Sequence, residues 1–403
     1  MTLTKHAGTG GLIKQAPEDF VVKEITSRGF VLQPDFRYDA KSLGMEEAPE
    51  GKHISFVLQK RDWNTVDALI AISKKLGHGR KSIAYAGSKD KKAISVQLAS
   101  VYHSMAFDLS TIQIKDIKIN GFWRSNGVEL GDDLGNAFEA TVKNAEHAER
   151  AEKIVDELGG KMPNYFGAQR FGDRGNNAKV GAAILKGNFE EAAIEYLTGT
   201  GNERNEEVRY MRTELKEKLD FKHALEHFPR YLRGERTVLT YLSKYPGNYA
   251  NALKLLPRGI ALMFVHAVQA SIFNEELEQR IKKNDFKSAL YAGSDFYGFP
   301  DLEKRGVNWD FPLAMLVGYE TKEEEIGAYA QEAVQSMQIS REDFRSKGMP
   351  ELAMKGAYRP LLVPIKELSY KISNEEFWLA FSLPKGSYAT MLLNEFIKSD
   401  NNT

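Results

Sequence analysis

Hydrophobic and polar positions alternate over several short stretches, a pattern typical of half-buried strands. The predicted strands lie at residues 11–33, 53–59, 93–98, 112–123 and 137–143. In the first of them, Phe20, Val22 and Ile25 alternate imperfectly, whereas residues 53–59 alternate clearly. Strand-like sequence punctuated by glycine returns at residues 356–390.

Helical periodicity separates these two strand-rich parts. Asn64-Thr65 can cap a helix over residues 65–76, and Gly77 can end it. The predicted apolar face of this helix consists of Val66, Leu69, Ile70 and Ile72. Further helices are predicted at residues 146–158, 180–185, 190–197, 263–281, 323–337 and 389–398. This order predicts an α+β core that is interrupted by a mostly helical insertion.

Composition agrees with such an architecture. A chain of 403 residues exceeds one typical domain, and its 42% hydrophobic and 27% charged content is that of a globular protein. The absence of cysteine excludes disulfides, thiolate metal sites and thiol nucleophiles. Neither a signal peptide nor a membrane-spanning run is evident, so we expect a cytoplasmic protein without a membrane partner.

The net charge is zero, but the charge is unevenly distributed. Residues 51–100 contain ten Lys and Arg against three Asp, whereas residues 1–50 contain six basic against eight acidic side chains. Any nucleic acid must therefore bind a localised basic face, with an affinity that falls steeply as salt rises.

Common motifs for phosphate, dinucleotide, serine-hydrolase and zinc sites do not occur in the sequence. His223 and His227 have the i, i+4 spacing of a helical metal pair, but the sequence shows no third ligand beside them. We therefore expect no metal site.

Asp90 lies among Lys89, Lys91 and Lys92 in the stretch YAGSKDKKAISVQ. One interpretation is a solvated turn, because Gly, Ser, Asp and Lys are common in turns. The other is a carboxylate that neighbouring cations keep ionised, so that it can attack a sugar or an electrophilic ring. Local spacing alone favours the turn.

Clusters of aromatic, glycine and basic residues occur at 164–172 and 383–390. Both can be explained by packing and by turns. They also suit an extruded nucleic-acid base, which needs a stacking ring, polar contacts to its edge and cations for its phosphates.

Six motifs, in order, resemble those of the TruD family of tRNA pseudouridine synthases, which act on uridine 13 of tRNA. They are PEDFVVKE at 17–24, AGSKDKKAISVQ at 86–97, LGNAF at 134–138, NYFGAQRFG at 164–172, QASIFN at 269–274 and LPKGSYAT at 383–390. The resemblance covers nearly the whole chain and is closest to the archaeal type. The chain departs from the family pattern at Ala137 and Asn394, where the family commonly has arginine.

The resemblance implies that Asp90 is the catalytic aspartate. It also implies that Phe20, Asn136 and Tyr388 line the uridine pocket and that Phe138 lies beside the target base. Lys89, Arg170 and Lys385 are candidates for holding Asp90 ionised or for binding phosphate.

The fold implied by the resemblance is a pseudouridine-synthase core with an antiparallel-rich mixed sheet, interrupted by an inserted domain. We expect the core at residues 1–172 and 351–403 and the insertion at residues 173–350. The implied partner is tRNA, and we expect a monomer.

The implied reaction breaks the N1–C1′ bond, rotates the uracil and rejoins it through C5, which requires no cofactor. Asp90 can attack C1′, add to the ring or promote a glycal intermediate, and the sequence does not distinguish these roles. Two other functions compete with this one. The first is a noncatalytic RNA-binding or RNA-folding protein, and the second is a glycosidase-like hydrolase built on Asp90 and Glu24.

Overall fold

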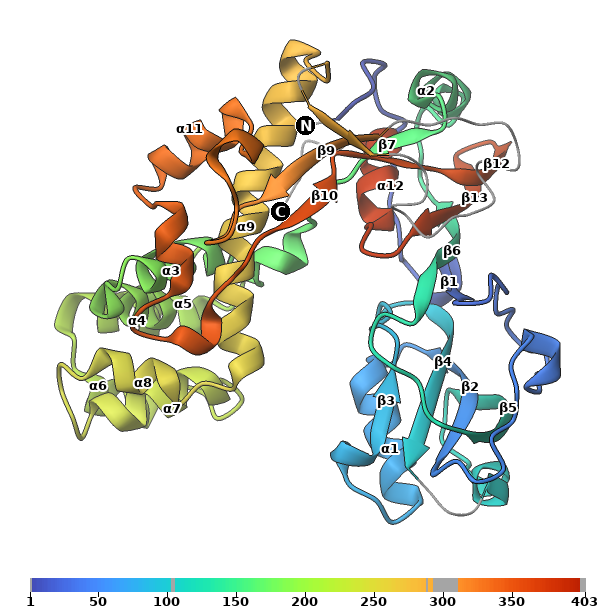
Figure 1. Ribbon diagram of the computed structural model, residues 1–403, viewed down its shortest axis with the longest axis horizontal. Coiled ribbons are helices and arrows are strands. Elements are labelled where there is room, and N and C mark those ends of the chain that lie inside the picture. Colours follow the sequence, from blue (N-terminus) through green and yellow to red (C-terminus); the bar gives the residue numbers. More distant parts are fainter. Residues whose placement is uncertain (1, 103–105, 288, 293–310, 399–403) are drawn as a thin grey trace.

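The computed structural model describes residues 2–102, 106–287, 289–292 and 311–398. Figure 1 shows two lobes, one built on a large sheet and one mostly helical. Both ends of the described chain lie with the sheet lobe, because Leu3 and Thr4 bond to Glu395 in the last helix. The chain therefore leaves the sheet lobe, forms the helical lobe and returns.

The large sheet has eight strands in the order β12-β13-β6-β1-β4-β2-β5, and β3 pairs with β4 outside this path. Their bounds are β1 Phe20–Thr26, β2 His53–Arg61, β3 Ile83–Tyr85, β4 Ile94–Tyr102, β5 Ile117–Ser125, β6 Asp133–Val142, β12 Lys366–Ser373 and β13 Glu376–Pro384. Only β1 and β4 run parallel, and every other neighbouring pair in this sheet is antiparallel. The predicted α+β class with an antiparallel-rich mixed sheet is therefore confirmed.

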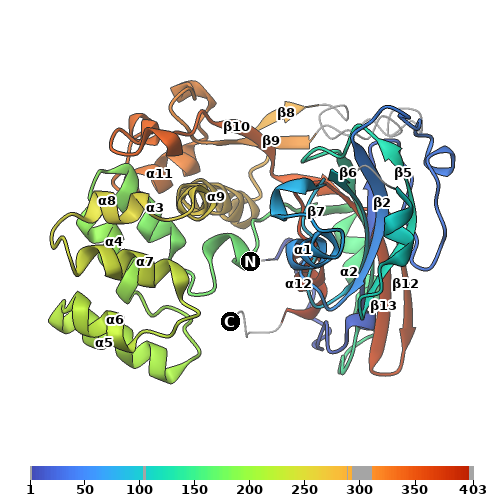
Figure 2. The same cartoon turned by 90° about the horizontal axis from the view of Figure 1, so that it is seen from below.

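One face of this sheet carries two separate hydrophobic cores. At one end, α1 (Thr65–Lys75) packs through Ala68, Leu69 and Ile72 on β2 and β4. At the other end, α2 (Arg150–Leu158) and α12 (Ala389–Ile397) pack on β1, β6 and β13. Figure 2 shows α1 and α12 on the same side of the sheet, toward the helical lobe. The strip of sheet between the two cores carries the polar side chains described below.

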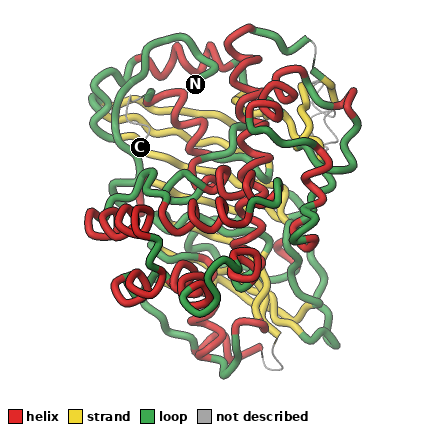
Figure 3. Tube along the Cα trace, turned by 90° about the vertical axis from the view of Figure 1, so that its left-hand side faces the viewer, coloured by secondary structure: helices red, strands yellow, loops and turns green. Residues whose placement is uncertain are grey.

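The helical lobe has its own core. Its buried members lie between Val180 and Leu352, and they come from helices that pack around the long helix α9. The helix bounds are α3 Asn177–Leu185, α4 Phe189–Thr198, α5 Glu206–Lys218, α6 Phe221–His227, α7 Arg233–Leu242, α8 Tyr249–Lys254, α9 Arg258–Lys283 and α11 Ala328–Ser336. A side chain on Gly181 would meet the Phe264 carbonyl oxygen at 2.1 Å, so glycine allows α3 to lie against α9. Figure 3 shows helices in front of the strands when the molecule is viewed from this lobe.

Two small sheets lie where the chain passes between the lobes. Their strands are β7 Lys161–Pro163 with β11 Leu362–Pro364, and β8 Leu290–Ala292, β9 Phe311–Leu316 and β10 Ala357–Pro360. A mixed cluster that includes Phe166, Phe273 and Leu361 packs beside them. The junction is therefore a packed region, not an isolated linker.

The bounds of the helices and strands show which predictions from local sequence are correct. The predicted strand at 53–59 and the helix at 65–76 are confirmed, and the Asn64 side chain accepts from the Val66 amide as the predicted cap. The predicted helix start at residue 146 is wrong, because α2 begins at Arg150 after a turn. The predicted helix at 389–398 is confirmed, since α12 spans Ala389–Ile397.

Within the described ranges, none of the helices combines the length and the apolar character that crossing a bilayer needs.

Candidate active site

A polar strip crosses the sheet between the two cores. Strand pairing places Lys60, Ser95, Val22, Phe138 and Phe381 in one cross-strand row. Lys60 and Ser95 are buried, so the row changes from polar to aromatic along its length. In the neighbouring row, Glu24 pairs with Asn136 and Asn136 with Leu383. Buried polar groups at this point of a sheet need partners, and the loop that carries Asp90 supplies several of them.

The loop from Ala86 to Ala93 joins β3 to β4 and is fixed along its length. The Gln97 amide donates to the Gly87 carbonyl at 3.0 Å. The Lys89 amide donates to the Thr65 hydroxyl at 3.0 Å, and that hydroxyl donates to Gln97 at 2.9 Å. The loop thus hydrogen-bonds both to the sheet and to the first residue of α1, and a loop held in this way can aim a side chain.

Asp90 is the partly exposed carboxylate on this loop. Its side chain is 29% exposed, and its Oδ1 lies 2.7 Å from the Lys14 ammonium. Lys14 has φ +56° and places the same ammonium 4.1 Å from the centre of the Phe20 ring. The carboxylate therefore has a bound cation on one side and retains exposed surface for a substrate.

Lys89 does not hold the Asp90 carboxylate, which corrects the role expected for it. Its ammonium lies 2.8 Å from Glu24 and 3.4 Å from Asp133, and its side chain is 3% exposed. Burial raises the pKa of Glu24, and the charge of Lys89 acts against that rise. The Lys89 ammonium is shared by two buried acids, and the cation paired with Asp90 is Lys14, which is 76 residues away in the sequence.

Lys60 is a second buried lysine beneath the loop. Its ammonium donates to the carbonyl oxygens of Asp90 at 2.8 Å and Lys89 at 3.4 Å. Burial lowers the pKa of Lys60 to about 8, although the nearby charge of Asp90 partly opposes this effect. Lys60 therefore fixes the backbone at the position from which the Asp90 side chain projects.

The lowered pKa of Lys60 predicts a specific pH dependence of stability. The unfolded chain holds the Lys60 proton up to about pH 10.4, whereas the folded protein releases it near pH 8. The free energy of unfolding therefore increases as pH rises from about 8 to about 10.4, by up to about 3 kcal/mol in total. Denaturant unfolding should show this gain in the wild type and not in Lys60→Met. Lys52 is exposed, so Lys52→Met is the control and should show the same gain as the wild type. The prediction would be contradicted if the free energy of unfolding depended on pH in the same way in all three proteins.

The phenylalanines expected at the uridine pocket lie under the site. Phe20 is fully buried and Phe138 is 5% exposed. Their ring centres are 5.9 Å apart, and Phe138 stacks on Phe381 at 5.3 Å. These rings form a rigid aromatic floor in this structure, and Phe20 has no exposed surface on which a base could stack.

Asn136 is a polar residue on β6, in the cross-strand row next to that of Phe138 and Phe381. Its side-chain oxygen is buried and accepts no hydrogen bond from any residue that the structure describes. A side chain on the preceding Gly135 would meet the Leu383 carbonyl oxygen at 2.2 Å, so glycine is needed for the close pairing of β6 with β13. Asn136 is thereby held in place with an unused acceptor.

A second group of expected residues gathers around Phe166. The Arg170 guanidinium lies 5.3 Å from the Phe166 ring centre, and the Tyr388 ring approaches edge-on at 6.4 Å. Asn274 of the QASIFN motif bonds to both the amide and the carbonyl of Phe166. Three motifs far apart in sequence therefore meet at one ring.

Arg359 completes this group and was not predicted from the sequence. Its guanidinium lies 3.9 Å from the Phe166 ring centre and donates to the Asn164 side chain at 2.9 Å and to the Gly386 carbonyl at 3.0 Å. It thereby ties the NYFGAQRFG segment to the LPKGSYAT segment. The local sequence AYRP on an edge strand carries no signal of this role.

Lys385 connects the two groups. Its ammonium donates to the Gly131 carbonyl at 3.2 Å, and its amide donates to the Leu134 carbonyl at 3.0 Å. The Gly131 amide in turn donates to Ala86 at the start of the Asp90 loop. The exposed Lys385 is thus anchored by its backbone near both groups, where its ammonium is accessible to a phosphate.

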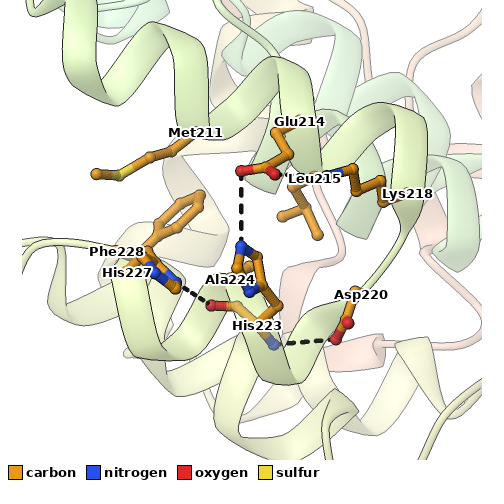
Figure 4. A pocket seen from close by; sticks show the side chains of 9 residues that line it. All are labelled: Met211, Glu214, Leu215, Lys218, Asp220, His223, Ala224, His227 and Phe228. Atoms are coloured by element: carbon orange, nitrogen blue, oxygen red, sulfur yellow. Dashed lines mark hydrogen bonds and ion pairs between the residues drawn. The ribbon is translucent and has the colours of Figure 1, made fainter.

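The histidine pair of the sequence analysis lies on the helical lobe. Figure 4 shows His223 and His227 in a small pocket with Glu214 and Asp220. His227 donates to the His223 carbonyl at 2.8 Å, and Asp220 accepts from the His223 amide at the start of α6. In the described part of the chain, no three His, Asp or Glu side chains are grouped as a metal site would require. The pair has a local structural role.

Comparison with known proteins identifies the family of this chain. The sequence model of the family described as tRNA pseudouridine synthase D (TruD) matches residues 1–293 and 305–396. A Methanosarcina mazei protein named as a probable tRNA pseudouridine synthase D is 34% identical, over 98% of this chain and 95% of its own. A protein of the same name from Archaeoglobus fulgidus is 33% identical, over 99% of this chain and 97% of its own.

A solved structure shows the same fold. The crystal structure of a Methanosarcina mazei protein, described as a candidate tRNA pseudouridine synthase D (TruD), superposes with a TM-score of 0.75. The two chains are 32% identical, and the match covers 99% of this chain and 96% of the other. This chain belongs to the TruD family of tRNA pseudouridine synthases.

Proposed function

We propose that this protein converts uridine to pseudouridine in tRNA, at position 13, and that Asp90 acts on the target nucleotide. The observation that carries the assignment is the Asp90 carboxylate, which is partly exposed, bound to Lys14 and fixed on a loop between two hydrophobic cores. Family membership supplies the reaction class and the substrate class.

The reaction moves atoms within one nucleotide. The target uridine leaves its stack, the N1–C1′ bond breaks, the uracil turns, and C5 bonds to C1′. The C5 proton is lost and N1 gains a proton, so the composition is unchanged. Asp90 can assist by attacking C1′, by adding to the ring or by promoting a glycal, since an anionic carboxylate stabilises positive charge at an anomeric carbon.

The surrounding residues have distinct proposed roles. The unused Asn136 oxygen can accept from the N–H groups of the uracil edge. Tyr388 and Arg170, both at the Phe166 ring, can contact the base or its neighbours, and Lys385 can neutralise a phosphate. Phe20 and Phe138 support the site from below.

The two competing functions are less well supported. The hydrolase would use Glu24 as a second carboxylate, but Glu24 is 1% exposed and is bound to Lys89 and the Leu98 amide. A noncatalytic RNA-binding role would leave the ion-paired Asp90 carboxylate without a purpose. Within the proposal, the chain acts as a cytoplasmic monomer and residues 173–350 are the inserted domain. The core of the helical lobe runs from Val180 to Leu352, two residues beyond that proposed boundary.

Incubation of the purified protein with unmodified tRNA transcripts tests the proposal. Chemical mapping should show pseudouridine at position 13, and no free uracil should be released. A transcript with cytidine at position 13 is the matched control and should remain unmodified at that position. Release of uracil, or binding without any modified uridine, would refute the assignment.

A further inference from the structure

A basic groove lies on the helical lobe, away from the Asp90 site. It has a volume of about 520 Å³ and follows the outer face of α7. Its chemistry is set by four cations and two tyrosines, namely Arg230, Arg233, Arg236, Lys244, Tyr241 and Tyr245. Among the described residues that line it, none is acidic. Figures 1 and 2 place α7 across the molecule from α1, which covers one side of the Asp90 loop.

The helical spacing explains why the groove is basic. Residues 230–245 contain four basic side chains and one acid, Glu235. Glu235 lies on the inner face with Val238 and Leu239, and it is buried against Arg212 at 2.9 Å. The acid is therefore neutralised inside the lobe, while Arg233 and Arg236 on α7, together with Arg230 and Lys244 just beyond its two ends, line the groove. This concentration of charge occurs in a chain whose net charge is zero.

The cations and rings of the groove are arranged for binding. The Arg236 guanidinium is held by the Leu225 and Phe228 carbonyls at 2.7 and 2.6 Å, so its charge is fixed in position. Within the described chain, Arg233 and Lys244 form no ion pair with a carboxylate, and both are exposed. The Tyr241 and Tyr245 rings are 4.9 Å apart, and Tyr245 is 56% exposed.

Arginine and lysine side chains neutralise phosphates, and exposed tyrosines stack on unpaired bases. We propose that this groove binds a single-stranded segment of the RNA substrate, at a distance from the uridine that enters the Asp90 site. The inference rests on the proposed function for the identity of the RNA. An acidic protein segment would use the cations but would leave the paired tyrosine rings without a role.

A second cleft lies beside the basic groove. This cleft has a volume of about 950 Å³, and its lining extends from Gln169 and Gly172 to Tyr231. Tyr231 is exposed and adjoins Arg230, which lines the basic groove. The two clefts are therefore adjacent, but the second also has acidic side chains in its lining, Asp173, Glu203 and Glu235, so the proposed RNA site is the basic groove.

The test is the affinity of the full-length protein for unmodified tRNA at several salt concentrations. In Arg233→Gln/Lys244→Gln, we expect the Kd to rise about 10-fold near 0.1 M salt. The slope of log Kd against log salt should become shallower by about 1.5, because two phosphate contacts are lost. Tyr245→Ser should weaken binding with the salt slope unchanged, since stacking involves no counterion. Arg236 is left intact because it also holds the end of α6.

The matched control is Lys216→Gln/Lys222→Gln, which removes two exposed charges from α5 and α6 outside the groove. This control should bind tRNA as the wild type does. If the groove variant has the affinity and salt slope of the control, the proposal is wrong. The binding assay needs no catalysis, so groove-dependent binding without pseudouridine would refute the proposed function alone, whereas pseudouridine formation with groove-independent binding would refute this inference alone.

Discussion

Replacement of Asp90 with asparagine should abolish pseudouridine formation while tRNA binding is retained. The amide is nearly isosteric and can still accept from Lys14, but it lacks the negative charge that the bond cleavage requires. We expect turnover to fall by at least about 10³-fold, as is common when the reacting carboxylate or nucleophile of an enzyme is removed. Single-turnover assays with mapped tRNA give the rate, and filter binding gives the Kd.

Asp62→Asn is the matched control for this change. Asp62 is exposed, and its amide donates to the Ala93 carbonyl at the end of the same loop. The same chemical substitution there should leave both activity and folding near wild-type values. Asp90→Asn should also unfold close to the wild type, because Asp90 is partly exposed and its single ion pair contributes little to stability. Wild-type turnover in Asp90→Asn would exclude Asp90 as the reacting group.

Local sequence patterns predicted the elements whose signals are local. Helix α1 follows from a capping Asn64 and a periodic apolar face. Its buried stripe nevertheless includes Thr65, Ala68 and Ser73, whereas Val66 and Ile70 are only half-buried. The reason is that the polar members bond to neighbouring segments, as Ser73 does to Gly79 and Ser82. Hydrophobicity alone therefore identified the helix but misplaced its face.

The site required contacts that no local pattern encodes. Lys14 meets Asp90 across 76 residues, and Arg359 meets Asn164 across 195 residues. Three lysines lie beside Asp90 in sequence, yet the carboxylate is bound by a fourth from another segment. The ordered motifs correctly indicated the family. They did not show which charged groups pair within the site.

Replacement of Lys89 with methionine should destabilise the protein more than any other single change on the Asp90 loop. Lys89 is the cation between Glu24 and Asp133, whose side chains are 1% and 8% exposed. Without it, two buried carboxylates face each other, and loss of one partner from a buried ion pair costs about 3 to 5 kcal/mol. Lys91→Met removes an exposed lysine from the same loop and should stay within about 0.5 kcal/mol of the wild type.

The loss of stability in Lys89→Met should be larger at high pH than at low pH. Burial already raises the pKa of Glu24, and loss of Lys89 removes a charge that opposes this rise. The pKa of Glu24 in the folded variant then lies further above its unfolded value of about 4.3. The free-energy cost of ionising Glu24 in the folded state is therefore absent below about pH 4.3 and grows as pH rises. Denaturant unfolding should therefore show a smaller difference between Lys89→Met and Lys91→Met near pH 5 than near pH 8. Equal stability of the two variants at pH 8 would show that the Lys89 side chain does not anchor the loop.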